Sequence, residues 1–560
     1  IVDWTRIRKW AGADPVASVG SEEHHTTTWT GLISNDWNDP GNWSSGLPGA
    51  GSQINIPGGT SPVIFGGTMT VSPPAALNVA PGGALTVTGD LASTGSFIIG
   101  STISSSGSLI VGGTATGNIT YNRQLLPGDN IAADWHLAAP PVTANSETNT
   151  GKITALYQWS EPTGTWTTTG ITSAVAGRGY NIRQEPGSDG MIGFTGPLAN
   201  GDVTTEASSP YADAVSGDAS YFARLIADGR SLENPGGKGW NLLGNPYPSG
   251  VNASAFINAN YSVTPSLSQF DPNYVALYLF DGTGRQYYYL ASSTGWPSGN
   301  ELSETHVQAG QGFFVLAMND NSVFRFTKAM QEHSTATPML KSGKSDDRWP
   351  GLQLKVKHPG GEVVTTVVYN GSMTAGVDPG YDIGLFKSGQ DLELYTSLAL
   401  KDNGINYTRQ ALPLSGADTL AVPVGIDFKS GGEVTFSAVT VPVDGRRLWL
   451  HDRVTGIFTD LSLKSYTATL PADTYGTGRF FIVASANTPT AIDRSGSDDG
   501  ELRIWTSGGR LVIQGMVTGG SLCELYDIHG RKMLEQNLSD AGLNTIVLPA
   551  GLHGVAVVKV

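Results

Sequence analysis

GALTV at residues 83–87 returns as GSFII at residues 95–99 and again as GSLIV at residues 107–111. A repeat at a fixed spacing is typical of stacked architectures, in which each unit packs on its neighbours. In every copy, apolar residues stand two apart after a glycine, which predicts a short strand with one face turned inward. The repeat therefore predicts a short β-solenoid.

Upstream of the repeat, three tryptophans stand within fifteen residues among Asn, Asp, Gly and Pro: Trp29, Trp37 and Trp43. This composition predicts a turn-rich segment with a small aromatic core. Because stacked repeats need capped ends, we expect this segment to close one end of the solenoid. It forms one expected domain with the repeat, over residues 29–117, after a polar connector at residues 1–28.

The same segment is rich in side-chain oxygen atoms, which come from Asn35, Asp36, Asn38, Asp39 and Asn42. Carboxylate and amide oxygens in this number are compatible with a calcium site. The EF-hand loop pattern is absent, however, and Asn and Asp also close turns by accepting hydrogen bonds from nearby backbone. The turn interpretation is favoured, so no metal site is predicted.

A longer duplication follows the repeat and is visible from the order of three motifs. WHLAAPP at 135–141 is echoed by WNLLGNP at 240–246, ALYQW at 155–159 by ALYLF at 276–280, and AGRGY at 176–180 by AGQGF at 309–313. The offset between the copies grows along the chain, so the second copy carries insertions. Residues 118–328 are therefore expected to hold two related β units.

The rest of the chain divides at two stretches rich in Ser, Gly, Asp and Pro, which are predicted linkers at residues 329–350 and 488–500. Alternating strands between them predict a β-sandwich at residues 351–487. The final unit, residues 501–560, alternates cleanly through six expected strands and is compatible with a compact β-sandwich. The expected fold is all-β and multi-domain.

Composition and charge exclude several classes of function. The net charge of −15 argues against nucleic acid as a partner, because phosphate binding needs clustered Lys and Arg. A single cysteine, Cys523, allows no disulfide within the chain, and its apolar strand neighbours predict a buried structural thiol. No apolar run reaches the roughly 18 residues of a membrane-spanning helix. The chain starts at Ile1 rather than Met, so we expect that a signal was removed or that upstream protein is missing.

Searches for catalytic motifs find none. HExxH, GxSxG and the Walker A pattern are absent, and the nine histidines are scattered. A pair of carboxylates brought together from distant strands is still conceivable, but ordinary solvated Asp and Glu are the favoured interpretation. The chain is therefore expected to be non-enzymatic and to need no cofactor.

Tyr287 and Tyr289 are the candidate ligand-binding residues. They follow an Asp-Gly turn, and strand alternation places both on one face. Such a face is able to stack on a sugar ring or a partner protein. Tyrosine is also a good strand former in its own right, and that structural interpretation is favoured.

The end of the chain carries a resemblance to a known family. LYDIHGRK at 525–532, LPAG at 548–551 and VAVVKV at 555–560 resemble the type A C-terminal sorting domain of type IX secretion cargo in Bacteroidetes. The resemblance implies an Ig-like β-sandwich that directs a periplasmic protein through the outer-membrane translocon. A β-barrel shuttle protein would recognise the end of the domain, and a sortase would then attach the cargo to lipopolysaccharide. The sequence departs from the family pattern at Ala556, where Tyr is usual.

The resemblance assigns the sorting signal to Asp527, Gly530, Arg531, Gly554, Lys559 and Val560. Gly530 also fits a hairpin turn, where a positive φ is favourable, and Arg531 would then serve only to build that turn. An exposed final strand is suited to capture by strand addition. Upstream, WNLLGNPYP at 240–248 and GQGFFV at 310–315 are similar to modules of large Bacteroidetes surface proteins, but they imply no reaction.

Two functions from different classes follow. The first is the C-terminal stalk region of a large adhesin-like surface protein, exported through the periplasm and outer membrane by its sorting domain. The second is a glycan-binding module at residues 118–328, or the non-catalytic C-terminal part of a secreted hydrolase. Binding of a glycan that depends on Tyr287 and Tyr289 would favour the second.

Overall fold

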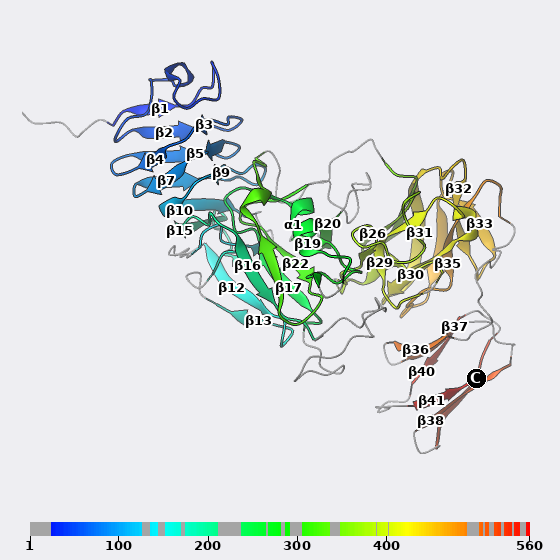
Figure 1. Cartoon of the computed structure of the whole chain (residues 1–560). Helices are drawn as coiled ribbons and strands as arrows, with labels where there is room; N and C mark the ends of the chain where they lie inside the picture. The colour runs from blue at the N-terminus through cyan, green and yellow to red at the C-terminus, as the bar shows by residue number, and fades with distance from the viewer. Residues whose placement is uncertain are drawn as a thin grey trace, which may run out of the picture.

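The structure is a computed structural model that describes residues 24–125, 135–143, 152–169, 174–210, 237–264, 267–281, 286–291, 305–335, 348–387, 389–400, 402–489, 503–507, 510–514, 520–527, 531–539, 543–548 and 556–560. Strands account for 52% and helices for 4% of the residues that the structure describes, so the all-β prediction is confirmed. In Figure 1 the solenoid lies at one end of the molecule in blue. The duplicated units follow in cyan and green, and the domain at 351–487 lies beyond them in yellow.

The solenoid has about four turns, and each complete coil consists of three short strands that pair in parallel with the strands of the next coil. β1 (Thr26–Thr28) pairs with the first coil, which holds β2 (Gln53–Ile56), β3 (Val63–Ile64) and β4 (Thr68–Val71). The next holds β5 (Ala76–Val79), β6 (Ala84–Val87) and β7 (Asp90–Ser93), and the last holds β8 (Ser96–Ile99), β9 (Ser108–Val111) and β10 (Ala115–Gln124). The predicted short solenoid is confirmed.

The twelve-residue spacing turns out to be a step between strands on different sides of the solenoid. Ala84 of β6 pairs with Ser108 of β9, and Ala76 of β5 pairs with Ser96 of β8, so a coil takes 20 to 24 residues. Residues twelve apart share an inward alternation because each lies on a short strand of the same core. The twelve-residue repeat therefore marks single strands, whereas a full coil takes 20 to 24 residues.

Both ends of the solenoid are covered. At the first coil, the rings of Trp29 and Trp43 lie 5.1 Å apart and those of Trp37 and Trp43 4.6 Å apart, all buried. At the last coil, β15 (Met191–Pro197) of the next unit pairs antiparallel with β10. A strap at residues 328–335, which includes β24 (Gln331–Glu332), lies over β6 and β9, where both ring nitrogens of His333 bond the hydroxyls of Thr86 and Ser108. The expected linker at 329–350 thus begins with ordered structure, while residues 336–347 and 490–500 lie outside the described residues, as do residues 1–23.

The duplicated region forms two four-stranded sheets with the same strand order, β11-β14-β12-β13 and β17-β22-β19-β20. The first holds β11 (Trp135–Ala138), β12 (Ile153–Ser160), β13 (Thr165–Thr168) and β14 (Tyr180–Gln184); the second holds β17 (Trp240–Gly244), β19 (Leu277–Asp281), β20 (Gln286–Leu290) and β22 (Gly312–Leu316). The register also agrees, since Leu137 pairs with Asn181 where Leu242 pairs with Phe314. Each motif of the duplication therefore occupies an equivalent strand.

The two sheets meet through matching backbone contacts. The amide of Ala139 donates to the carbonyl of Gly310, and at the equivalent positions the amide of Gly244 donates to the carbonyl of Gly177, both at 3.0 Å. Isolated bridges between Ala138 and Gln311 and between Leu243 and Arg178 repeat the relation. Reciprocal contacts of this kind define a local pseudo-two-fold axis between the copies.

Smaller elements complete this region. They are β16 (Val203–Ala207), which pairs with β23 (Ser322–Phe326); β18 (Gly250–Asn252), which pairs with β21 (His306–Val307) and β24; the helix α1 (Ala253–Asn260); and the 3-10 helix η5 (Lys328–Met330). A further 3-10 helix, η1 (Pro40–Asn42), belongs to the cap of the solenoid. The side chain of Asn252 caps α1 by accepting a hydrogen bond from Ala255.

The next domain is built on one eleven-stranded sheet, which encloses one large apolar cluster and carries two smaller ones. Its elements are β25 (Gly351–His358), β26 (Gly361–Asn370), β27 (Ile383–Gly384), β28 (Leu392–Thr396), β29 (Tyr407–Pro413), η6 (Ala417–Thr419), β30 (Ala421–Phe428), β31 (Gly432–Val441), β32 (Arg447–Asp452), β33 (Ile457–Asp460), β34 (Tyr466–Leu470) and β35 (Phe480–Ser485). β32 and β33 form a hairpin.

The final unit contains two three-stranded sheets, β36-β37-β40 and β39-β38-β41. Its strands are β36 (Arg503–Ser507), β37 (Arg510–Gln514), β38 (Leu522–Asp527), β39 (Lys532–Asn537), β40 (Leu543–Val547) and β41 (Ala556–Lys559). Leu511, Ile513 and Ile546 of one sheet share a core with Cys523 of the other, so the unit is a small sandwich. Cys523 is fully buried, as its neighbours predict.

Candidate functional site

The candidate site is the edge of the final sandwich at β41. β41 pairs antiparallel with β38, where Glu524 lies opposite Lys559 and Asp527 opposite Ala556. Among the described residues, no strand pairs with the other side of β41. Val557 and Val560 are exposed on this strand. An edge strand with open backbone groups is a template for pairing with another chain.

Glu524 ties β41 to the rest of its sheet. The side chain of Glu524 is only 10% exposed, and its carboxylate lies between the ammonium groups of Lys532 on β39 and Lys559 on β41. The distance from Nζ of Lys559 to Oε2 of Glu524 is 2.8 Å. Hydrogen bonds from Lys532 and Lys559 lower the pKa of Glu524 to about 2, and the bond to Glu524 raises the pKa of Lys559. One carboxylate on β38 is thus paired with side chains on both neighbouring strands.

The predicted sorting residues are only partly placed. Lys559 is the one that enters this ion-pair cluster, and Val560 follows it at the exposed end of β41. Arg531 is exposed beside β39, and Asp527 ends β38, while Gly530 and Gly554 lie outside the described residues. Sequence analysis missed Glu524 and Lys532, because only the register of three strands shows that they meet.

The predicted aromatic face is not open at Tyr289. Its side chain is 2% exposed, and the guanidinium carbon of Arg409 lies 5.6 Å from the ring centre. Arg409 belongs to β29 of the next domain, so Tyr289 is buried at a junction between domains and cannot stack on a sugar from solvent. The backbone of Tyr287 pairs with Phe280, but its side chain lies outside the described part of the chain.

The Asn and Asp side chains of the cap are used in turns. Asn42 is fully buried, its oxygen accepts hydrogen bonds from the amides of Ile33 and Ser34, and its nitrogen donates to the carbonyl of Asp36. Asp39 accepts from the amide of Gly41. These oxygens are occupied by backbone donors, which agrees with the turn interpretation. Within the described ranges, no three His, Cys, Asp or Glu side chains are grouped as metal ligands.

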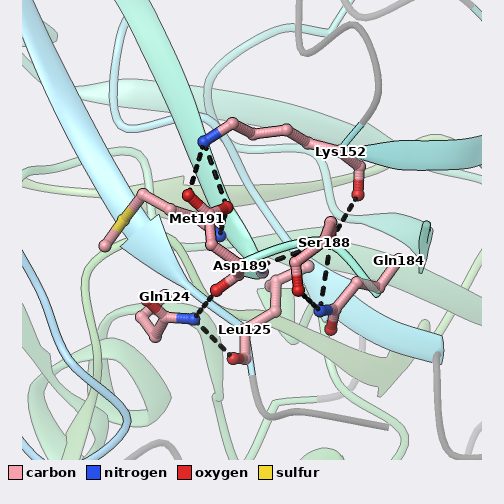
Figure 2. A network of polar contacts seen from close by, with 8 residues as sticks. Gln124, Leu125, Lys152, Gln184, Ser188, Asp189 and Met191 are labelled. Atoms are coloured by element: carbon pink, nitrogen blue, oxygen red, sulfur yellow. Dashed lines mark hydrogen bonds and ion pairs between the residues drawn. The ribbon is translucent and has the colours of Figure 1, made fainter. Parts of the chain in front are cut away.

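A polar network joins the solenoid to the first β unit, as Figure 2 shows. Lys152, which precedes β12, contacts both carboxylate oxygens of Asp189 at 3.0 and 3.1 Å. Gln124, at the end of β10, donates to the backbone carbonyl of Asp189 at 2.6 Å, and Gln184 of β14 donates to Ser188. These contacts link the turn before β15 to β10, to β14 and to the residue before β12, so the network fixes the junction.

These features define a multi-domain β protein whose final sandwich is distinct from the solenoid-based body. The chain belongs to a family described as a domain of unknown function, DUF8693, whose model matches residues 28–483. The matched range spans the solenoid, both β units and the domain at 351–487, and it stops before β36. No curated protein and no solved structure matches the chain. No helix in the described part of the chain is long and apolar enough to cross a membrane.

Proposed function

We propose that this chain is the stalk region of a secreted cell-surface protein, without catalytic activity, and that its final sandwich directs export through type IX secretion. The observation that carries the proposal is the edge strand β41, which pairs with β38 on one side and whose Lys559 forms an ion pair with Glu524. In the motifs at 525–532 and 555–560, which resemble the sorting domain, the described residues lie on β38, at the start of β39 and on β41.

Physical chemistry supports a recognition role for this edge. Backbone groups on an open strand give affinity to a partner strand, and the exposed Val557 and Val560 add apolar surface. A translocon and its shuttle protein would act as the partner. The family match also ends before this sandwich, as expected if the sandwich is a separate module that serves transport rather than the function of the body.

Deletion of residues 501–560 tests the proposal in a Bacteroidetes host with an active type IX system. We expect the truncated protein to accumulate in the periplasm, because the partner of β41 would have no strand to bind. Cell fractionation with an antibody against the solenoid would measure this, and protease treatment of intact cells would report surface display. In the reciprocal experiment, residues 490–560 fused to a periplasmic reporter should bring the reporter to the surface.

A point variant separates recognition from folding. Lys559→Ala removes the ion pair to Glu524 but leaves the strand sequence otherwise unchanged, so we expect reduced export of a folded protein. Val323→Ala, at an exposed apolar side chain of the body, is the matched control and should be exported normally. Surface display of the 501–560 deletion at the level of the full chain would refute the sorting role.

A further inference from the structure

An aromatic ring from the domain at 351–487 packs on the sheet of the second β unit. This ring belongs to Phe386, which follows β27. Its centroid lies 4.4 Å from the ring centroid of Trp240, 5.6 Å from that of Phe314 and 5.9 Å from that of Tyr278. Next to it, the hydroxyl of Tyr278 donates to the carbonyl of Gly384 at 2.8 Å. Trp240, Tyr278 and Phe314 lie on β17, β19 and β22 and share one face of the sheet. This face is therefore a receptor for a protein loop that carries a phenylalanine.

The first β unit repeats the receptor by pseudo-two-fold symmetry. Strand register makes Trp135 the equivalent of Trp240, and Tyr157 the equivalent of Tyr278. The rings of Trp135 and Tyr157 lie 5.3 Å apart, compared with 5.0 Å for Trp240 and Tyr278. Both side chains are partly exposed, and the ring contacts of the described residues bring no phenylalanine to them. The Trp-Tyr pair is thus preserved in the first unit, where no described residue takes the place of Phe386.

Two substitutions make the first receptor more polar than the second. Asn181 stands where the second unit has Phe314, and Arg183 stands where it has Leu316. The side-chain oxygen of Asn181 and the Nε of Arg183 are buried without a hydrogen-bond partner. A buried polar atom without a partner costs free energy, commonly about 1 to 3 kcal/mol, which a ligand that supplies the partner recovers. A guanidinium group favours a carboxylate as that partner.

We propose that Trp135, Tyr157, Asn181 and Arg183 form a docking site for a loop of another polypeptide that carries an aromatic side chain beside an acidic one. The aromatic side chain occupies the position that Phe386 occupies in the second unit. The acidic group pairs with Arg183, which replaces the apolar Leu316. The occupant is a protein because the equivalent face of this same chain holds a protein loop. This surface is distinct from β41 and does not depend on the sorting role.

A peptide based on the natural occupant provides the probe. Residues 380–391 of this chain contain Phe386, and the Lys387→Asp version places an acidic residue beside it. With fluorescently labelled peptides and the full chain, we expect the acidic version to bind more tightly than the natural one by fluorescence anisotropy. Replacement of Phe386 by Ala in the peptide should abolish binding, because the ring is the part that enters the receptor.

Variants of the protein locate the binding site. Trp135→Ala should weaken the acidic peptide by more than tenfold, and Asn181→Asp should weaken it through charge repulsion without removal of a core side chain. Phe65→Ala, an exposed aromatic side chain on the solenoid, is the matched control and should leave affinity unchanged.

Several results would overturn the proposal. One is peptide affinity that is insensitive to both Trp135→Ala and Asn181→Asp. Another is affinity lost on Trp240→Ala but not on Trp135→Ala, because the peptide would then have displaced Phe386 from the second unit. The third is a glycan array in which sugars bind in a Trp135-dependent way while the peptides do not, since the site would then recognise carbohydrate.

Discussion

Asp452 is a buried carboxylate that joins the two ends of the eleven-stranded sheet. Its oxygens accept from Nε and Nη2 of Arg479 at 3.0 and 2.8 Å and from the hydroxyl of Tyr466 at 2.7 Å. Burial alone would raise the pKa of Asp452, but the hydrogen bonds from Arg479 and Tyr466 outweigh burial and lower it. Because Tyr466 begins the edge strand β34 and Asp452 ends β32, the cluster closes the sheet around its core.

Asp452→Asn should therefore destabilise this domain. The substitution leaves Arg479 partly buried without its counter-charge, and loss of one member of such a pair commonly costs about 3 kcal/mol. Calorimetry of the full chain would show the transition of this domain at a lower temperature. Asp444→Asn is the matched control, because its side chain is 79% exposed and its pair with Arg446 should contribute little. Equal shifts for the two variants would contradict the prediction.

At the scale of single residues, the sequence predicts whether a side chain is buried better than it predicts which residues that side chain contacts. The apolar neighbours of Cys523 predict its burial, and the structure confirms it. Lys559 is predicted as a sorting residue, but its ion pair with Glu524 depends on the register of β38 and β41, which local sequence does not determine. Tyr289 alternates like an exposed strand residue, but it is buried in a cluster that includes Tyr278 of its own sheet, and Arg409 of the next domain lies over its ring.

At the scale of elements, the strap at 328–335 connects the second β unit to the solenoid. Burial lowers the pKa of His333 to about 4, and in the neutral state its nitrogens bond Thr86 and Ser108. In the unfolded chain the same side chain titrates near its ordinary pKa of 6.5. Between pH 4 and pH 6.5, His333 therefore binds fewer protons in the docked strap than in the unfolded chain. Docking of the strap thus becomes less stable as the pH falls from about 6.5 to 4.

Hydrogen exchange tests this pH dependence. After correction for the intrinsic effect of pH, the amides of the strap should exchange faster at pH 5 than at pH 7, with a loss of local stability of about 2 kcal/mol. His333→Gln, which cannot be protonated, should remove most of the difference. His358→Gln, a substitution in another domain, should leave the difference in exchange between pH 5 and pH 7 unchanged. Equal protection of the wild-type strap at both pH values would contradict the assignment.

The solenoid shows why an element can be predicted while its stacking is misjudged. Inward alternation identifies β6, β8 and β9 as strands because one face of each is apolar. Which strands are neighbours depends on the bends between them, and these lie in Gly-rich turns with no periodic signal. The twelve-residue repeat thus predicts strands correctly and leaves the coil length open.

At the scale of the molecule, Phe386 holds the second β unit and the next domain together. Trp240, Tyr278 and Phe314 surround its ring, and the hydroxyls and amides of Asn273, Asn403 and Tyr407 form a second set of contacts across the same junction. The predicted linker separates these domains in sequence, yet contacts among distant residues join them in space. Local composition does not report such contacts.

Phe386→Ala should loosen this junction. Removal of the ring leaves a cavity against three aromatic side chains, a change that commonly costs about 3 kcal/mol. Small-angle X-ray scattering should then show a larger and more variable particle than the wild type, while the domains themselves stay folded. Phe65→Ala is again the matched control, and unchanged scattering for Phe386→Ala would show that the polar contacts suffice.

The reciprocal contacts between the two β units have an evolutionary consequence. A chain with a single unit would carry both halves of the contact, the edge at Ala139 and the carbonyl at Gly177, and two such chains would associate as a homodimer. Duplication of the gene and fusion of the two copies would make that association independent of protein concentration. It would also free each former subunit to diverge, so that one now carries Phe314 against the ring of Phe386 while the other carries Asn181 at the equivalent position.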